Sequence, residues 1–126
     1  MKRKNYTTFA AIHLGSEMLS MQITEYHNTE RYKVVECCNR RIRLGEATFK
    51  NKIIPFPLVS EICEILIGFK RLMKEYGVEE YVMQATTAVR EASNQVFLLD
   101  QIYNKTGLVV DVVDMPKEIY TKFVAI

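Results

Sequence analysis

The residues of this chain with the clearest chemical use lie at a break in an apolar run near the amino end. Gly15 and Ser16 interrupt a strand-like stretch that extends from Phe9 to Ile23. The residues on both sides suit short β-strands, because apolar and polar side chains alternate after the break. Glycine lets a ligand approach the backbone N–H groups of such a turn, and serine adds a hydroxyl. The pair predicts contact with a phosphate, although most Gly-Ser hairpins bind no ligand.

Polar residues also follow the later strands that the sequence predicts. Thr86, Thr87 and Arg90 come after the fourth strand, and Glu118 comes after the fifth. Parallel strands of an open sheet present ligands at their carboxyl ends, so these residues are expected at one edge together with Ser16. The planar guanidinium of Arg90 suits phosphate oxygens, and Glu118 could activate a water molecule as a general base.

Each of these residues also has a purely structural interpretation. Arg90 could pair with Glu91 or face solvent, and Glu118 could be a first-turn carboxylate favoured by the helix dipole. Arg43 and Glu46 could close the mouth of the site or form a solvated strand end.

The elements that would position these residues follow from hydrophobic periodicity. Three antiparallel strands come first, and the later strands are reached through helices by right-handed crossovers, so they should be parallel. Pro57 suits a first helical turn, Gly77 a left-handed stop, and Asn94 an N-cap. The fifth strand is rich in β-branched residues and is expected to be buried on both faces. The predicted strands are 7–14, 18–26, 31–44, 81–85 and 108–113, with helices at 57–76, 95 to about 107 and 117 to about 125.

Composition limits the classes of protein. The chain of 126 residues carries a net charge of +2, which gives no general attraction to DNA or to an anionic membrane. No apolar run is long enough for a membrane span, and no signal peptide is evident. The three cysteines form no CxxC motif, and the two histidines have no zinc-ligand spacing. Free thiols in a cytoplasmic, single-domain protein with a disordered start are therefore expected.

Several segments together resemble a known family. Ala-Ala-Ile-His-Leu-Gly-Ser at 10–16, Arg-Leu-Gly-Glu at 43–46 and Ala-Thr-Thr-Ala-Val-Arg-Glu-Ala-Ser-Asn at 85–94 precede a strand and a glutamate-bearing helix. In this order, over nearly the whole chain, they resemble the N-terminal domain of the exopolyphosphatase and guanosine pentaphosphate phosphohydrolase (Ppx/GppA) family. The resemblance implies an α/β domain of ribonuclease-H-like, actin-like ATPase fold, with a five-stranded mixed sheet. The Gly-Ser hairpin alone would equally suit a sugar kinase or acetate kinase of the same superfamily.

The resemblance also implies roles for individual residues. Gly15 and Ser16 would cradle a phosphate, with Thr87 and Arg90 holding a phosphoryl group. Glu118 falls at the position of the catalytic glutamate that orients or deprotonates the attacking water. The implied reaction is hydrolysis of a terminal phosphoanhydride of polyphosphate or guanosine polyphosphate with Mg²⁺, a reaction that depends on positioning and charge neutralisation.

This chain departs from the family pattern at three places. His13 replaces an Asp that handles the cation, Glu17 and Met18 replace an Asn-Ser pair, and Met115 lies where a Ser-Gly turn is usual. Mg²⁺ prefers oxygen ligands, so an imidazole is a poor replacement. Two alternatives to an enzyme follow: a non-catalytic phosphate- or nucleotide-sensing module, and an interaction domain with a vestigial site.

The resemblance finally implies a larger protein. In this superfamily the cleft lies between two domains, so the 126 residues are expected to be the N-terminal half, inactive alone. The full-length protein is expected to form a homodimer.

Overall fold

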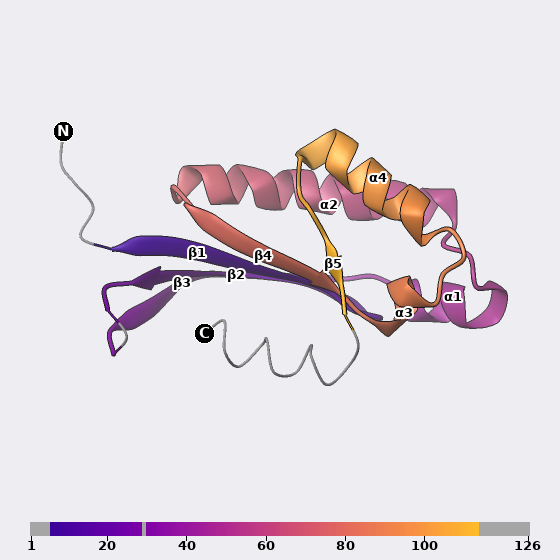
Figure 1. Ribbon diagram of the computed structural model, residues 1–126, viewed down its shortest axis with the longest axis horizontal. Coiled ribbons are helices and arrows are strands. Elements are labelled where there is room, and N and C mark those ends of the chain that lie inside the picture. The colour runs from indigo at the N-terminus through magenta and orange to yellow at the C-terminus, as the bar shows by residue number, and fades with distance from the viewer. Residues whose placement is uncertain (1–5, 29, 114–126) are drawn as a thin grey trace.

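The fold is a five-stranded sheet with helices packed on one face (Figure 1). It is described here from a computed structural model, for residues 6–28 and 30–113. Together with the predicted strands, two extra helices appear. The elements, in order, are β1 (Thr7–Leu14), β2 (Met18–Tyr26), β3 (Tyr32–Arg41), α1 (Leu44–Asn51), α2 (Phe56–Glu75), β4 (Glu80–Ala85), α3 (Thr87–Arg90), α4 (Gln95–Thr106) and β5 (Asp111–Val112).

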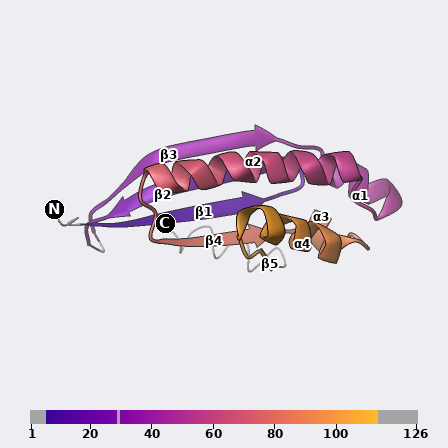
Figure 2. The ribbon, with the colours of Figure 1, turned by 90° about the horizontal axis from the view of Figure 1, so that it is seen from above.

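The strand order in the sheet is β3-β2-β1-β4-β5. β1 pairs antiparallel with β2, and β2 antiparallel with β3, while β4 runs parallel to both β1 and β5. The predicted antiparallel meander followed by parallel strands is therefore confirmed. Because β1, β4 and β5 are parallel, their carboxyl ends lie at the same end of the sheet. Figure 2 shows this from above for β1 and β4.

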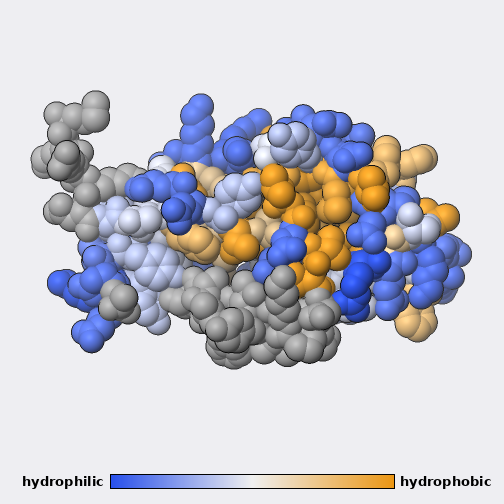
Figure 3. Space-filling view, in the orientation of Figure 1, coloured by the Kyte–Doolittle hydropathy of each residue, from blue (hydrophilic) through white to orange (hydrophobic). Residues whose placement is uncertain are grey.

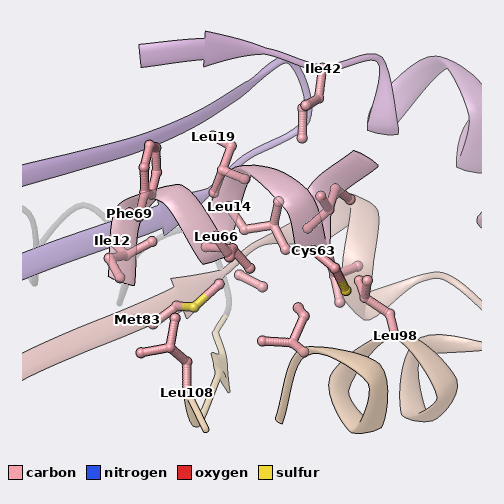
Figure 4. Close-up of a cluster of buried hydrophobic side chains, with 14 of the residues drawn as sticks. Ile12, Leu14, Leu19, Ile42, Cys63, Leu66, Phe69, Met83, Leu98 and Leu108 are labelled. Carbon is pink, nitrogen blue, oxygen red and sulfur yellow. The ribbon is translucent and has the colours of Figure 1, made fainter. Parts of the chain in front are cut away.

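Alternation along the strands directs one face of the sheet toward the helices. In β1 the buried residues are Thr8, Ala10, Ile12 and Leu14, whereas the residues between them are less covered. α2 contributes the complementary apolar stripe, which the helical spacing predicted. These side chains interdigitate between the sheet, α2 and α4 (Figure 4). The labelled core residues are Ile12, Leu14, Leu19, Ile42, Cys63, Leu66, Phe69, Met83, Leu98 and Leu108.

The ends of the two long helices follow the predicted signals. Proline occupies the first turn of α2, and Gly77, with φ of 66°, follows its end. Gly107, with φ of 77°, ends α4. Glycine suits both positions because a side chain makes the left-handed backbone costly.

The predicted strand 31–44 is wrong at its end. β3 stops at Arg41, and residues 44–51 form the helix α1, which the sequence analysis did not predict. Gly45, which directly follows the predicted strand, lies in the first turn of α1, where its backbone N–H donates to the Ser16 carbonyl at 2.8 Å. A tertiary contact, which local pattern cannot reveal, therefore decides the conformation here.

The fifth strand is also shorter and more exposed than expected. The strand covers Asp111–Val112, at the edge of the described sheet, and the Val113 N–H donates to the Ala85 carbonyl at 2.9 Å just beyond it. Asp111 is exposed and Val112 is half-buried, so burial on both faces is wrong for this strand. The β-branched composition is the same in an edge strand and a central one, and only the topology distinguishes them.

Asn94 takes the predicted N-cap position, but its side chain does not cap the helix. Instead it accepts a hydrogen bond from the Ile54 N–H and donates one to the Ile54 carbonyl, both at 2.9 Å. The residue thereby joins the segment before α2 to the start of α4. The predicted disordered start and last helix, 117–125, lie outside the described residues.

Candidate functional site

The β1–β2 turn closes with a short hydrogen bond and leaves two amides available. The Gly15 N–H donates to the Met18 carbonyl at 2.9 Å, so this amide is engaged within the turn. In the part of the chain that the structure describes, the Ser16 and Glu17 amides donate to no acceptor. The turn therefore offers the amides of Ser16 and Glu17, with the Ser16 hydroxyl, while Gly15 shapes the turn.

The segment after β3 holds this turn from the other side. The Ile42 N–H donates to the Glu17 carbonyl at 2.9 Å, and the Gly45 N–H to the Ser16 carbonyl at 2.8 Å. A Cβ at Gly45 would lie 2.9 Å from the Ser16 Cβ, which is closer than side-chain atoms normally approach. Because both turn carbonyls are engaged here, the contact fixes the peptide planes of the turn.

A small, mainly polar pocket lies at this junction. It has a volume of about 260 Å³ and is lined by Ser16, Glu17, Arg41, Ile42, Arg43 and Glu46. The predicted placement of Arg43 and Glu46 at the mouth is consistent with this lining. Arg41 was missed, although its pairing with Met18 at the hairpin end would follow from the β2–β3 register.

The loop after β4 joins the same edge of the sheet. The Thr86 N–H donates to the Leu14 carbonyl at 3.2 Å, next to the Gly15 turn. Thr86 is buried and Thr87, half-buried, begins the short α3, which was expected as loop. Figure 1 shows α1 and α3 beside the end of β1. We call the edge formed by residues 15–17, 41–46 and 86–90 the carboxyl-end rim.

Arg90 ends α3 and crosses toward β5. Its Nη1 donates to the Val113 carbonyl at 3.3 Å. The predicted alternative, a pair with Glu91, does not form, because the Glu91 carboxylate lies 3.4 Å from Lys52 Nζ. Arg90 is exposed, and the guanidinium keeps further N–H donors that can bind an anion.

His13 lies on the sheet face away from α2 and contacts the turn. It is adjacent to Ser20 on β2 and to Gln84 on β4. A Cβ at Gly15 would meet the His13 ring at 3.0 Å, so this glycine leaves room for the imidazole. The ring thus packs against the predicted phosphate turn.

The two remaining expectations for the site concern the segment after β5. Glu118 and Met115 lie outside the described residues, so the catalytic carboxylate remains a prediction. The rim brings together Ser16, Arg43 and Glu46, and connects them through Leu14 to Thr86.

The donor set of the rim does not fit a resident Mg²⁺. Across residues 6–28 and 30–113, no group of three or more His, Cys, Asp or Glu side chains could hold a metal ion. Glu17 and Glu46 share their pocket with Arg41 and Arg43, whose charges oppose a cation. His13 supplies nitrogen where Mg²⁺ would prefer oxygen.

Comparison with known proteins identifies what this arrangement is similar to. The sequence model of the Ppx/GppA phosphatase family matches residues 22–126. The crystal structure of the Aquifex aeolicus member of the Ppx/GppA protein family has a TM-score of 0.88 at 24% identity, covering 95% of this chain and 39% of that one. An exopolyphosphatase from Cytophaga hutchinsonii gives 0.84 at 22% identity, covering 90% and 36%.

A curated relative extends the comparison to a longer protein. The bifunctional 3-dehydroquinate synthase/phosphatase of Fusobacterium nucleatum is 24% identical over 132 residues, which is 97% of this chain and 19% of that protein. The chain therefore spans about two fifths or less of each of these relatives. The structural matches confirm the expected ribonuclease-H-like, actin-like ATPase fold. No helix in the described segments is long and apolar enough to cross a membrane.

Proposed function

The chain belongs to the Ppx/GppA phosphatase family, and on that premise we propose that it forms one wall of the phosphate-binding cleft of a phosphoanhydride hydrolase. The main support is the junction at Ser16, where the turn amides, Arg41 and Arg43 border one polar pocket. The 126 residues are the N-terminal domain of a longer chain in this proposal, and the complete cleft includes a second domain.

The proposed substrate is a polyphosphate or guanosine polyphosphate that lies along the rim. The amides of Ser16 and Glu17 and the two arginines would bind its phosphate oxygens. The amides would stabilise them by hydrogen bonds, and the guanidinium groups would also neutralise their charge. Arg90 would hold the terminal phosphoryl group that is cleaved from the substrate. Glu118 would orient the attacking water, a step that requires the segment after β5 to face the rim.

The residues of this chain perform the proposed steps without a metal ion that the protein itself holds. Since the described donors do not fit a resident Mg²⁺, we propose that a Mg²⁺ requirement reflects the ion that polyphosphate itself carries into the cleft. Charge neutralisation by the protein then depends on the arginines. Cytoplasmic location and a homodimer of the full-length protein remain part of the proposal.

The test is phosphate release from long-chain polyphosphate by the full-length protein. Arg90→Ala and Glu118→Gln are each expected to reduce the rate by about 10²–10³-fold, the usual cost of removing one transition-state contact. Arg31→Ala is the matched control, because Arg31 is exposed at the opposite end of β2 and β3. Equal rates in all four proteins would contradict the proposal.

A sensing function is the second candidate, and the position of His13 favours it. An imidazole against the Gly15 turn is suited to holding a phosphate when protonated, but not to binding Mg²⁺. This candidate predicts polyphosphate binding without phosphate release, with binding lost in Arg90→Ala. Activity gained in His13→Asp would instead support the hydrolase and locate the altered step at this residue.

A further inference from the structure

A second pocket lies at the end of the sheet opposite the carboxyl-end rim. It sits where β4 begins, between the second half of α2 and the end of α4, and has a volume of about 480 Å³. We call it the amino-end pocket. Its lining residues are Ile67, Lys70, Arg71, Met73, Lys74, Val78, Glu79, Glu80, Tyr81, Lys105 and Thr106.

The mouth of this pocket is rich in positive charge. Lys70, Arg71 and Lys74 come from α2, and Lys105 comes from α4. All four side chains are exposed, and within residues 6–28 and 30–113 none of them forms an ion pair. A ligand in the pocket would therefore meet cations from two different helices.

The carboxylates of the lining offset only part of this charge. Glu80 pairs with Phe9 in the β1–β4 ladder, whereas Tyr81 pairs with the buried Ala10. Successive residues of a strand project from opposite faces, so the Glu80 side chain leaves the pocket face. Glu79, just before β4, lies on the pocket side, so the described lining sets at most two carboxylates against four cations.

The floor of the pocket is apolar and well fixed. Met73 is buried, and Ile67 and Val78 are half-buried beside it. The Tyr81 hydroxyl accepts a hydrogen bond from the Val109 N–H at 3.0 Å, which holds the ring in place. On the face drawn in Figure 3, hydrophilic side chains lie along α2 and a hydrophobic area lies below α4.

The helix dipole accounts for the positions of only two of the four cations. Lys74 and Lys105 lie in the last turns of α2 and α4, where the helix dipole alone favours a positive side chain. Lys70 and Arg71 lie earlier in α2, where that stabilisation has fallen away. All four cations nevertheless border the same apolar floor.

We infer that the amino-end pocket binds a nucleoside phosphate, with the base on the apolar floor and the phosphates between the cations of α2 and α4. Its volume lies within the range of small-molecule sites, roughly 300–1,000 Å³. A bare phosphate chain would gain nothing from Met73, Val78 and Tyr81, whereas a planar base can bury its surface there. This inference does not depend on the function proposed for the rim.

The experiment measures nucleotide binding by the full-length protein, by calorimetry at low salt. ADP and GDP are the probes, with pyrophosphate and adenosine as the two halves of the ligand. The variant Lys70→Ala/Lys74→Ala is expected to weaken ADP or GDP binding about tenfold, since each exposed ion pair contributes roughly 0.2–1 kcal/mol. Lys33→Ala, an exposed lysine on β3, is the matched control and should bind as the parent does.

The variant Arg90→Ala distinguishes nucleotide binding at this pocket from binding at the rim. Arg90→Ala should leave ADP and GDP binding unchanged, even if it abolishes phosphate release. Pyrophosphate and adenosine should each bind at least tenfold more weakly than the intact nucleotide. Pyrophosphate that binds as tightly as ADP, nucleotide binding unaffected in Lys70→Ala/Lys74→Ala, or no saturable binding would each overturn the inference.

Discussion

The two ends of the sheet are built by different means. At the carboxyl-end rim, backbone hydrogen bonds join segments far apart in the chain, such as the Gly45 N–H to the Ser16 carbonyl and the Thr86 N–H to the Leu14 carbonyl. At the amino-end pocket, long side chains such as Lys70 and Lys105 border an apolar floor. Backbone hydrogen bonds fix the geometry of the rim, whereas the charges at the amino-end pocket are carried by long, flexible side chains.

This difference matches what each end would have to do. A hydrolytic site must hold a phosphate within a few tenths of an ångström of the productive geometry, which peptide groups can do because they hardly move. A binding pocket needs only net attraction and shape, which lysines on a rigid floor can supply. The difference leads to tests in which the two ends respond differently to substitution.

The largest expected effect comes from Arg90→Lys at the rim. Lysine keeps the charge but loses the planar fork, so phosphate release by the full-length protein should fall at least tenfold, toward the rate of Arg90→Ala. Lys70→Arg, the reverse exchange at the amino-end pocket, should leave ADP and GDP binding within about twofold, because that site depends on charge rather than on donor geometry. A loss of nucleotide binding in Lys70→Arg as large as the loss of phosphate release in Arg90→Lys would contradict the distinction between the ends.

The next effect concerns Asn94, whose amide joins the segment before α2 to α4. Asn94→Ala removes both hydrogen bonds to Ile54 and leaves the Ile54 N–H and carbonyl without these partners. The free energy of unfolding should therefore fall by about 1–3 kcal/mol. Asn104→Ala, on the exposed side of α4, should change it by less than about 0.5 kcal/mol. Urea unfolding of the chain measures both, and a similar loss in the two would refute the role of the Asn94 amide.

Two glycines give effects of opposite sign. Gly45→Ala places a methyl group 2.9 Å from the Ser16 Cβ, and crowding of about 1–3 kcal/mol should exceed the gain of about 1 kcal/mol in helix propensity. Gly68→Ala, in α2, meets no atom within 4 Å and should stabilise the fold by about 0.5–1 kcal/mol. Thermal unfolding compares the two, and a stabilising Gly45→Ala would show that the rim can relax.

Much of this architecture could be predicted from the sequence because it depends on local signals. Apolar, strand-forming residues predicted β1, and alternation predicted β2. The apolar stripe of α2 together with Gly77 predicted the longest helix. α1 could not be predicted, because its start at Leu44–Gly45 depends on a contact with Ser16, which is distant in the chain. The exposure of β5 also depends on its place at the sheet edge, which β-branched composition does not reveal.

The site was predictable to a similar extent. Ser16 and Thr86 were expected at one edge because they follow parallel strands, and the structure connects them through the end of β1. Arg41 was missed, since a strand arginine has no signal until its register beside Met18 is known. The use of the Asn94 amide by Ile54, rather than by its own helix, likewise depends on tertiary packing.

The smallest effect is pH-dependent and lies at the amino end of the sheet, where α2 meets β3. The Tyr76 hydroxyl donates to Glu36 Oε2 at 3.0 Å, and this hydrogen bond, together with burial, raises the pKa of Tyr76 above its ordinary value of 10.0. A pKa raised by folding means that the stabilisation is fully present below pH 10 and is lost as the pH rises through the folded value. The stability difference between the parent and Tyr76→Phe should therefore be constant up to about pH 10 and then shrink.

Urea unfolding from pH 8 to 11 measures this difference, with Tyr103→Phe, a change at an exposed tyrosine of α4, as the control. A difference that stays constant to pH 11 would mean that the Glu36 contact does not hold the proton. The end of α2 would then be fixed by packing alone, as the floor of the neighbouring pocket is.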